Sequence, residues 1–204
     1  MTFFLAMTVF PDVQKKAQEE LDRVFGGSRL PVGEDRESLP YIYALMKRTH
    51  RWHLVLPIFN RTVLRPVGNA DWHFTHDPEV YPDPMGFRPE RFLETPTHRS
   101  EPDPRNFIFG YGRRIYPGQC VIDNALFITI AQTLAVFSIT KPVDVNGRVV
   151  EPEVKFEPGT TTHPVPFRCL IKPRSDDHEQ LIKASEQLYP WERSDAKELE
   201  NTKW

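Results

Sequence analysis

The chain has 204 residues, of which 39% are hydrophobic and 26% charged, and its formal net charge is −2. This composition is that of an ordinary folded protein, and the length suffices for one domain with its own core or for a large part of a bigger one. The small net charge gives no electrostatic reason to expect binding to nucleic acid or to an anionic membrane.

Prolines, cysteines and the first residues set further limits. Twenty prolines against ten glycines predict stiff, loop-rich connections between elements. Cys120 and Cys169 form no spaced metal motif and no disulfide framework, which suits a reducing compartment. The start, MTFFLAMTVF, is apolar but about half as long as a membrane span, and it lacks the features of a signal peptide. We expect an exposed end that continues a helix or packs on another surface.

The first half of the chain predicts two helices. One spans residues 11–26, where Pro11 suits the first turn and Gly26 a C-cap. A second spans 39–53, whose apolar side chains recur at helical spacing. The following segments are expected to be extended over 54–64 and irregular over 66–74.

The second half predicts a long coil and then a buried helix. From Thr75 to Phe107 regularly placed prolines favour coil, and a structureless run of this length tends to be functional. Residues 119–139 are apolar on almost every face, which predicts a buried central helix. Strand-like runs follow at 143–156 and 165–173, then a short surface helix at 176–188 and a mobile end.

Three separated motifs occur in a fixed order. A helix with two basic residues three apart is followed by FRPERF (87–92), and then by FIFGYGRRIYPGQC (107–120) leading into the apolar helix. This arrangement resembles the C-terminal part of cytochrome P-450, the haem-thiolate monooxygenases, most closely the microsomal type of fungi. The resemblance implies a mainly α fold with small β-sheets (α+β), in which residues 1–174 form the P-450 portion, the N-terminal half is missing, and 175–204 form a charged, partly mobile tail.

The loop that binds haem in this family reads F-x-x-G-x-R-x-C-x-G. Here Phe109, Gly112, Arg114 and Gly118 match it, whereas Tyr116 stands where the cysteine ligand of the iron belongs. The resemblance therefore implies that these five residues surround haem b. A glycine allows a tight turn close to the macrocycle, and an arginine can pair with a haem propionate. The family's thiolate donates electron density to the iron, which a tyrosine cannot do in the same way.

Three interpretations of Tyr116 compete. It is a structural tyrosine in a loop that no longer binds iron, or a phenolate ligand of the kind found in catalase, or its role passes to the nearby Cys120. We favour the first, because an iron-bound phenolate needs a nearby base to hold it ionised; Arg113 and Arg114 keep the second open. Cys120 lies one helical turn away, roughly 5–6 Å from the ligand position.

The second family motif, E-x-x-R, pairs an acid with a base on one helix face, and its positions here are Arg48 and Arg51. In the family these two residues join the arginine of the PERF motif, here Arg91, in a buried structural cluster. At ~4 Å and an effective dielectric constant of about 20, each pair of like charges costs roughly 4 kcal/mol. We therefore expect that Arg48 swings out or that its surroundings rearrange.

The resemblance implies an oxidoreductase that inserts one oxygen atom into an apolar substrate, with an NADPH-dependent reductase as electron donor. It also implies anchoring at the endoplasmic-reticulum membrane, facing the cytoplasm; without the anchor, we expect a cytoplasmic protein. Because Tyr116 and Arg48 replace the motif residues and half of the family fold is missing, we expect this chain to be inactive, with haem retention in doubt. The sequence does not identify a substrate.

Two alternatives remain open. The chain is a non-catalytic remnant whose apolar surfaces, such as FFLAMTVF, bind a partner or lipid. Otherwise it is a tyrosinate-ligated haem protein with peroxidase-like activity. Several histidines also invite a metal-binding interpretation, but they lack zinc-type spacing with cysteine or acidic partners; these are His50, His53, His73, His76 and His163.

Overall fold

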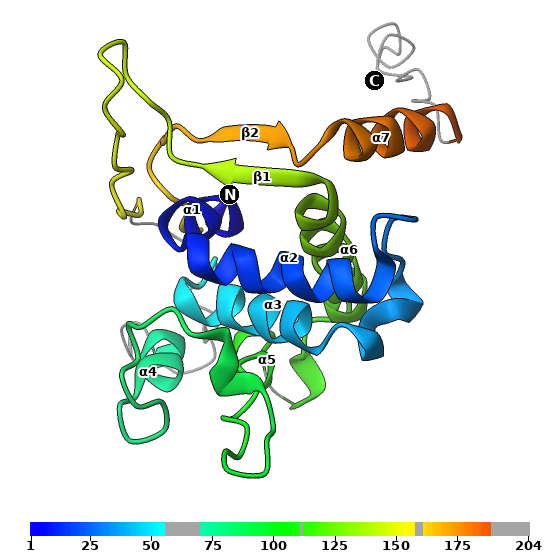
Figure 1. Ribbon diagram of the computed structural model, residues 1–204. Helices are drawn as coiled ribbons and strands as arrows, with labels where there is room; N and C mark the ends of the chain where they lie inside the picture. Colours follow the sequence, from blue (N-terminus) through cyan, green and yellow to red (C-terminus); the bar gives the residue numbers. More distant parts are fainter. Residues whose placement is uncertain (56–69, 111, 158–160, 189–204) are drawn as a thin grey trace, which may run out of the picture.

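A computed structural model describes residues 1–55, 70–110, 112–157 and 161–188, with residues 70, 71 and 114 described by their backbone alone. The fold is mainly α with one small β-sheet, as predicted (Figure 1). Its elements in chain order are α1 (Thr2–Val9), α2 (Pro11–Phe25), η1 (Gly33–Ser38), α3 (Pro40–Trp52), α4 (Ala70–His76), η2 (Pro89–Phe92), α5 (Arg105–Ile108), η3 (Gly112–Arg114), α6 (Gln119–Val136), β1 (Phe137–Thr140), β2 (Leu170–Pro173) and α7 (Asp176–Leu188).

The two helices predicted for the first half are confirmed as α2 and α3. Pro11 begins α2, and Gly26 ends it in the left-handed conformation at φ 54°, as expected for a C-cap. The N-terminus of α3 has no cap of its own, and Glu20 of α2 supplies one. Its buried carboxylate accepts hydrogen bonds from the backbone N–H groups of Tyr41 and Ile42, both at 2.9 Å. These bonds fix α3 beside α2 (Figure 1).

The first residues of the chain are not an exposed end. They form α1, whose side chains Phe3, Leu5, Ala6 and Met7 are at most 4% exposed and belong to the same core as α2, α3 and α6. The expectation of an exposed FFLAMTVF surface is therefore wrong. The run instead packs in the core beside other helices.

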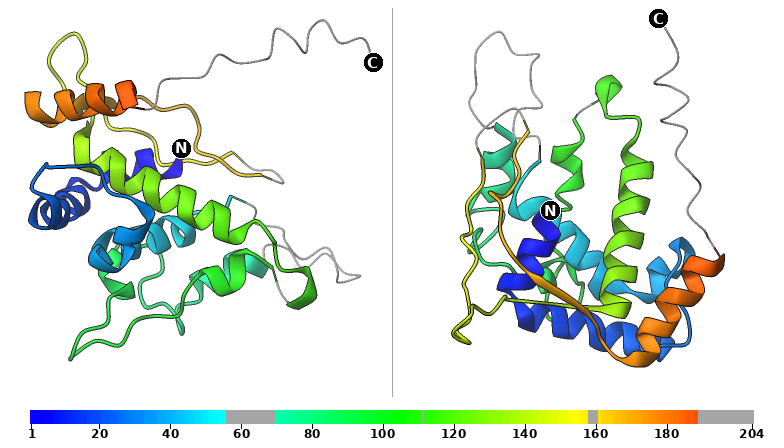
Figure 2. Two further views of the ribbon diagram at one scale, coloured as in Figure 1. Left: turned by 90° about the vertical axis from the view of Figure 1, so that its right-hand side faces the viewer. Right: turned by 90° about the horizontal axis from the view of Figure 1, so that it is seen from above.

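The helix predicted at 119–139 is shorter and less buried than expected. It ends at Val136, and its last predicted residues form β1 instead. The C-terminal half is buried and lies under α7, whereas Val121 and Ile122 near the other end are 72% and 40% exposed (Figure 2). By length and hydropathy, α6 is the helix among the described residues that could cross a membrane, with 39% of it buried. The core helix of a soluble protein passes the same test.

The sheet joins segments that are far apart in the sequence. β1 pairs antiparallel with β2, in a register that sets Phe137 opposite Pro173. The side-chain amide of Gln14 on α2 both donates to and accepts from the backbone of Ile139, each bond at 2.8 Å, and so ties β1 to the helices. Residues 143–156 do form a turn, with Gly147 at φ 78°. However, they contribute isolated bridges rather than a strand.

Two other predictions differ in outcome. The chain predicted to be irregular at 66–74 includes the start of α4, while the helix predicted at 176–188 is confirmed as α7. The long coil from Thr75 to Phe107 is present, interrupted by the short η2 and the start of α5. Most of the extended segment at 54–64, and the last residues of the chain, lie outside the described residues.

Candidate functional site

The glycine-arginine loop (residues 109–118) connects α5 to α6 as a closed turn. The backbone N–H of Tyr116 donates to the carbonyl of Phe109 at 2.8 Å, which closes the turn around η3. Gly112 has φ 57°, and a Cβ there would meet no atom within 4 Å, so its conformation rather than its space requires glycine. Gly118 has an ordinary φ of −81°, but a Cβ there would lie 2.7 Å from Cε1 of Tyr116. Gly112 is thus required for its backbone conformation, and Gly118 for the space that the ring of Tyr116 occupies.

A cavity of about 420 Å³, the loop cavity, lies where this loop meets α1, α3 and α6. Its volume is within the usual range for small-molecule sites, and apolar side chains dominate its lining. Of the predicted haem-loop residues, Phe109 and Tyr116 line it. The full lining is Met1, Thr2, Phe3, Thr49, His50, His53, Leu54, Val55, Ile108, Phe109, Tyr116, Ile122 and Leu126.

Tyr116 lies at the edge of the loop cavity with 42% of its surface exposed. Its ring is folded against Gly118 of its own loop, and its hydroxyl has no hydrogen-bond partner among the described residues. Arg113 is exposed, and the side chain of Arg114 lies outside what the structure describes. Among the described residues, no basic side chain is hydrogen-bonded to the phenol.

Cys120 lies outside the lining of the loop cavity. It is exposed on the first turn of α6. The interpretation that its thiol replaces the family's ligand is therefore not supported by the geometry. The cavity lining contains no cysteine.

Two histidines line the loop cavity: His50 on α3, and His53 directly after the end of that helix. His50 contacts Phe109 edge to face, with ring centroids 5.7 Å apart, and its Nε2 is buried without a hydrogen-bond partner. Burial lowers the pKa of His50 to about 4, so the ring is neutral near pH 7. His53 stacks on Phe156 at 3.4 Å, and burial lowers its pKa as well. Nothing in the sequence pattern marked these two histidines as neighbours of the loop.

The structure brings Arg48, Arg51 and Arg91 together in a buried group, here called the arginine cluster. Arg48 and Arg51 project from α3 and are wholly buried, and Arg91 of η2 is 5% exposed. Of the two expected outcomes, the first is therefore wrong: Arg48 does not swing out. Burial, and then the charges of the other two arginines, lower the pKa of Arg48 to about 8.

Main-chain carbonyls replace the missing acid as partners of Arg48. Its Nε and Nη2 donate to the carbonyl of Gly86 at 3.2 and 2.9 Å, and Nη2 also reaches Met85 at 3.3 Å. Arg51 donates to Pro84 at 2.6 Å, and to Thr75. Arg91 donates to the carbonyls of Pro82 and Asp83, and to Glu101 at 2.8 and 2.9 Å. Carbonyls of five consecutive residues, 82–86, thus surround the three guanidiniums.

This combination of loop, helix and cluster is matched by a known family. The family model described as cytochrome P-450 matches residues 1–170. The chain belongs to the cytochrome P-450 family.

Curated relatives agree with this assignment. A cytochrome P-450 monooxygenase of Postia placenta is 46% identical over 197 residues, which are 90% of this chain and 38% of that protein. The O-methylsterigmatocystin oxidoreductase of Aspergillus flavus is 42% identical over 212 residues, 97% of this chain and 39% of the relative. The chain therefore spans less than half the length of the cytochrome P-450 relatives that it matches.

A solved structure shows the same fold. A zebra fish cytochrome P-450, in a structure with abiraterone, superposes with a TM-score of 0.68 over 85% of this chain and 42% of that chain. The sequences are 24% identical, so this likeness carries the fold alone.

The residues at the loop cavity do not fit the haem-thiolate group of the P-450 family. That group needs a cysteine at the position of Tyr116, and neither this position nor the rest of the lining supplies one. The apolar walls and the loop backbone suit a flat apolar ligand, whereas the donor set is a phenol and two imidazoles. The apolar cavity therefore suits a flat ligand, but its side chains lack the thiolate that ligates iron in the family.

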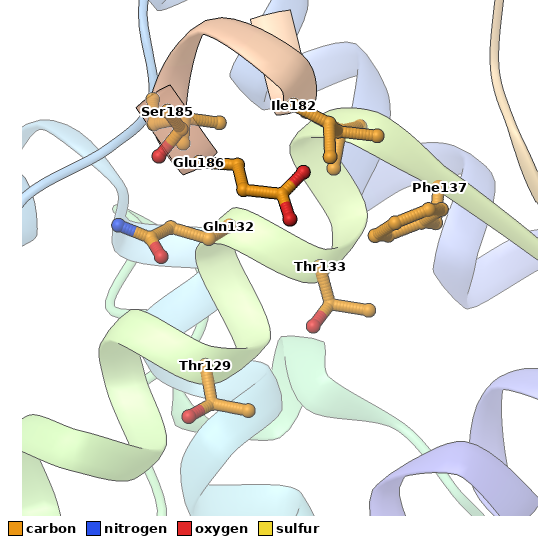
Figure 3. Close-up of a pocket in the computed structure, with 9 residues that line it drawn as sticks. Thr129, Gln132, Thr133, Phe137, Ile182, Ser185 and Glu186 are labelled. Carbon is orange, nitrogen blue, oxygen red and sulfur yellow. The ribbon is translucent and has the colours of Figure 1, made fainter. Parts of the chain in front are cut away.

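A second cavity, of about 480 Å³, lies apart from the P-450 motifs. Figure 3 shows Thr129, Gln132 and Thr133 of α6 facing Ile182, Ser185 and Glu186 of α7 across it. It contains none of the residues matched to the family's haem loop or arginine cluster. We therefore take the loop cavity as the candidate site.

Proposed function

We propose that this chain keeps the scaffold of a P-450 haem loop but does not carry out monooxygenation. The observation that carries the proposal is Tyr116, a phenol at the edge of an apolar cavity whose lining has no cysteine. Thiolate ligation is what promotes O–O cleavage in this family. A cavity without it can still bind a flat apolar molecule.

The arginine cluster supports the same proposal. Where the family has an acid, Arg48 makes all its hydrogen bonds to backbone carbonyls. The replacement of the acid by Arg48 leaves the coil at 82–86 in place but puts a positive charge where the family has a negative one. The chain therefore departs from the family both at the iron-ligand position, Tyr116, and at the acid of the E-x-x-R motif, Arg48.

The deciding experiment is a difference spectrum of the reduced, CO-treated protein after haem titration. We expect no Soret band of the thiolate type. The matched variant is Tyr116→Cys, which restores the family's residue and should gain such a band if the rest of the loop still holds haem. A thiolate-type band in the unchanged protein would overturn the proposal.

A second candidate function is a tyrosinate-ligated haem protein with peroxidase-like activity. It is favoured by the place of Tyr116 on the loop cavity and by the precedent of tyrosine ligation in catalase. Titration with haem and with iron-free protoporphyrin IX separates the candidates. If Tyr116 ligates iron, haem binds more tightly than protoporphyrin and Tyr116→Phe makes the two equal. Equal affinities in the unchanged protein would exclude iron ligation by the phenol.

The same titration tests whether the loop cavity binds a porphyrin without ligating its iron. We expect protoporphyrin IX to bind, with a loss of affinity in Leu126→Glu, which puts a charge into the lining. Leu188→Glu, which alters a side chain that is 75% exposed on α7, is the control. If neither porphyrin binds, the loop cavity is not a macrocycle site.

An electron donor is proposed by family membership alone. P-450 enzymes of the microsomal type use an NADPH-dependent reductase at the endoplasmic-reticulum membrane. For this chain we expect no NADPH consumption above background when such a reductase is added. Haem-dependent, substrate-stimulated NADPH oxidation would contradict the proposed inactivity.

A further inference from the structure

The arginine cluster carries more positive charge than its described neighbours balance. Both carboxylate oxygens of Glu101 bond to Arg91, at 2.8 and 2.9 Å. The carboxylate of Asp83 pairs instead with an exposed arginine. In the described part of the chain, three buried guanidiniums therefore share one carboxylate in direct contact. Buried charge without a counter-charge is strongly unfavourable.

Each arginine of the cluster also keeps one N–H group without a partner. The nitrogens concerned are Nη1 of Arg48, Nε of Arg51 and Nε of Arg91, all of them buried and without a hydrogen bond among the described residues. Buried polar atoms of this kind nearly always have a partner, and a charged donor left unpaired is especially costly. A negatively charged acceptor would both balance the surplus positive charge and accept hydrogen bonds from the unpaired N–H groups.

Hydrogen bonds to the backbone hold the three arginines in the cluster and keep their guanidiniums from turning toward water. Carbonyls of residues 82–86 accept hydrogen bonds from all three guanidiniums. Withdrawing one arginine would break the hydrogen bonds that its guanidinium makes to these carbonyls. The fold therefore holds the N–H donors in place, whereas the described residues do not supply a matching negative charge.

We propose that the arginine cluster binds a small inorganic anion, chloride or one of its size, in place of the carboxylate of the family's E-x-x-R motif. The proposal rests on the cluster alone and does not depend on whether the loop cavity binds a porphyrin. It assigns Arg48 a positive role, as one of the anion's donors.

The surroundings favour a monoatomic anion. The ring of Phe87 lies 4.9 Å from Cζ of Arg48, and the ring of Tyr81 lies 4.6 Å from Cζ of Arg51, so a face of each guanidinium is covered. Neither arginine has any exposed surface. Sulfate or phosphate is larger and carries more charge to remove from water.

The first test measures thermal unfolding of the whole chain at pH 7, with gluconate replaced stepwise by chloride at constant ionic strength. An anion that binds only the folded state raises Tm by roughly 3–5 °C for each tenfold increase above its Kd in a chain of this size. Bromide should act like chloride, and sulfate should not. Line broadening of ³⁵Cl NMR, reversed by bromide, reports the same site without unfolding. A Tm that is independent of the anion at constant ionic strength would overturn the proposal.

Two variants locate the effect. Arg48→Glu supplies a carboxylate in the cluster and Arg48→Met removes one donor, so both should abolish the chloride dependence of Tm and the NMR broadening. Arg99→Met removes an exposed arginine nearby and should leave both signals unchanged. If Arg48→Glu does not fold, Arg48→Met gives the same information. Retention of the full chloride effect in a folded Arg48 variant would show that the anion binds elsewhere.

Discussion

Among single residues, His50 links the loop cavity to the pH dependence of stability. Its pKa is about 4 in the folded chain because of burial, against 6.5 for an ordinary histidine. Between these values the unfolded chain binds more protons than the folded one, so the free energy of unfolding falls as pH falls. Above pH 6.5 the contribution is fully present, and at pH 4 roughly 2–3 kcal/mol of it has been lost.

We therefore predict that the urea midpoint falls steeply between pH 6.5 and 4, and less steeply in His50→Leu. His76, whose pKa burial also lowers to about 4, retains its own share in that variant. Asp103 loses its contribution only below its ordinary value of 3.8, because its pKa is lowered. A pH profile of His50→Leu that parallels the parent's would contradict the assignment.

The two loop glycines make a second prediction at this scale. Gly112→Ala forces a side chain into the left-handed region and should cost about 1–2 kcal/mol of stability whatever stands at 116. Gly118→Ala instead collides with the ring of Tyr116, and we expect a cost of about 1–3 kcal/mol. In a double-mutant cycle by urea denaturation, Tyr116→Ala should remove most of the cost at 118 and none at 112. Equal coupling at both positions would disprove the distinction.

The sequence predicted these positions but not the hydrogen-bond partners of their side chains. The pattern gave Phe109, Gly112, Tyr116 and Gly118 their places in the loop, and it put Arg48 beside two other arginines. It could not reveal that carbonyls of residues 82–86 accept from the guanidiniums, because backbone acceptors leave no mark on the sequence. The cavity-facing position of His50 was missed for a similar reason, since no spaced partner marks it.

At the scale of the elements, hydrogen bonds from the first turn of α3 to Glu20 join α3 to α2. Glu20 caps the two free N–H groups at the start of α3 from a neighbouring helix. We predict that Glu20→Ala lowers the free energy of unfolding by about 1–3 kcal/mol, because it leaves two buried donors unpaired. Glu19→Ala is the control: that exposed residue is paired with Lys15 at 4.0 Å, and its loss should stay within about 0.5 kcal/mol. Similar losses in both variants would contradict the capping role.

The elements themselves were predictable where their signals were local. Pro11 and Gly26 marked the ends of α2, and apolar spacing marked α3. The boundary between α6 and β1 was not predicted, because it depends on pairing with residues 170–173 and on the amide of Gln14. These partners lie far away in the sequence, so a continuous apolar run looked like a continuous helix.

At the scale of the whole molecule, one hydrophobic core connects α1, α2, α3, α6 and β1. Phe127 of α6 is wholly buried in it, as is Leu5 of α1. A single core shared by elements from both halves of the sequence predicts one cooperative unfolding transition, in which helix content and tryptophan fluorescence change together. Separate transitions for the two probes would show that the elements fold independently.

The same core predicts how substitutions along α6 differ. Phe127→Ala should destabilise the chain by about 3–5 kcal/mol, since it removes a buried ring and leaves a cavity. Val121→Ala, on the same helix but 72% exposed, should stay within about 0.5 kcal/mol. Leu5→Ala should lower the same single transition by about 2–5 kcal/mol, because α1 packs in the shared core. If Leu5→Ala leaves the midpoint unchanged while Phe127→Ala lowers it, α1 does not contribute to the cooperative unit, and α1 and α6 are not held by one core.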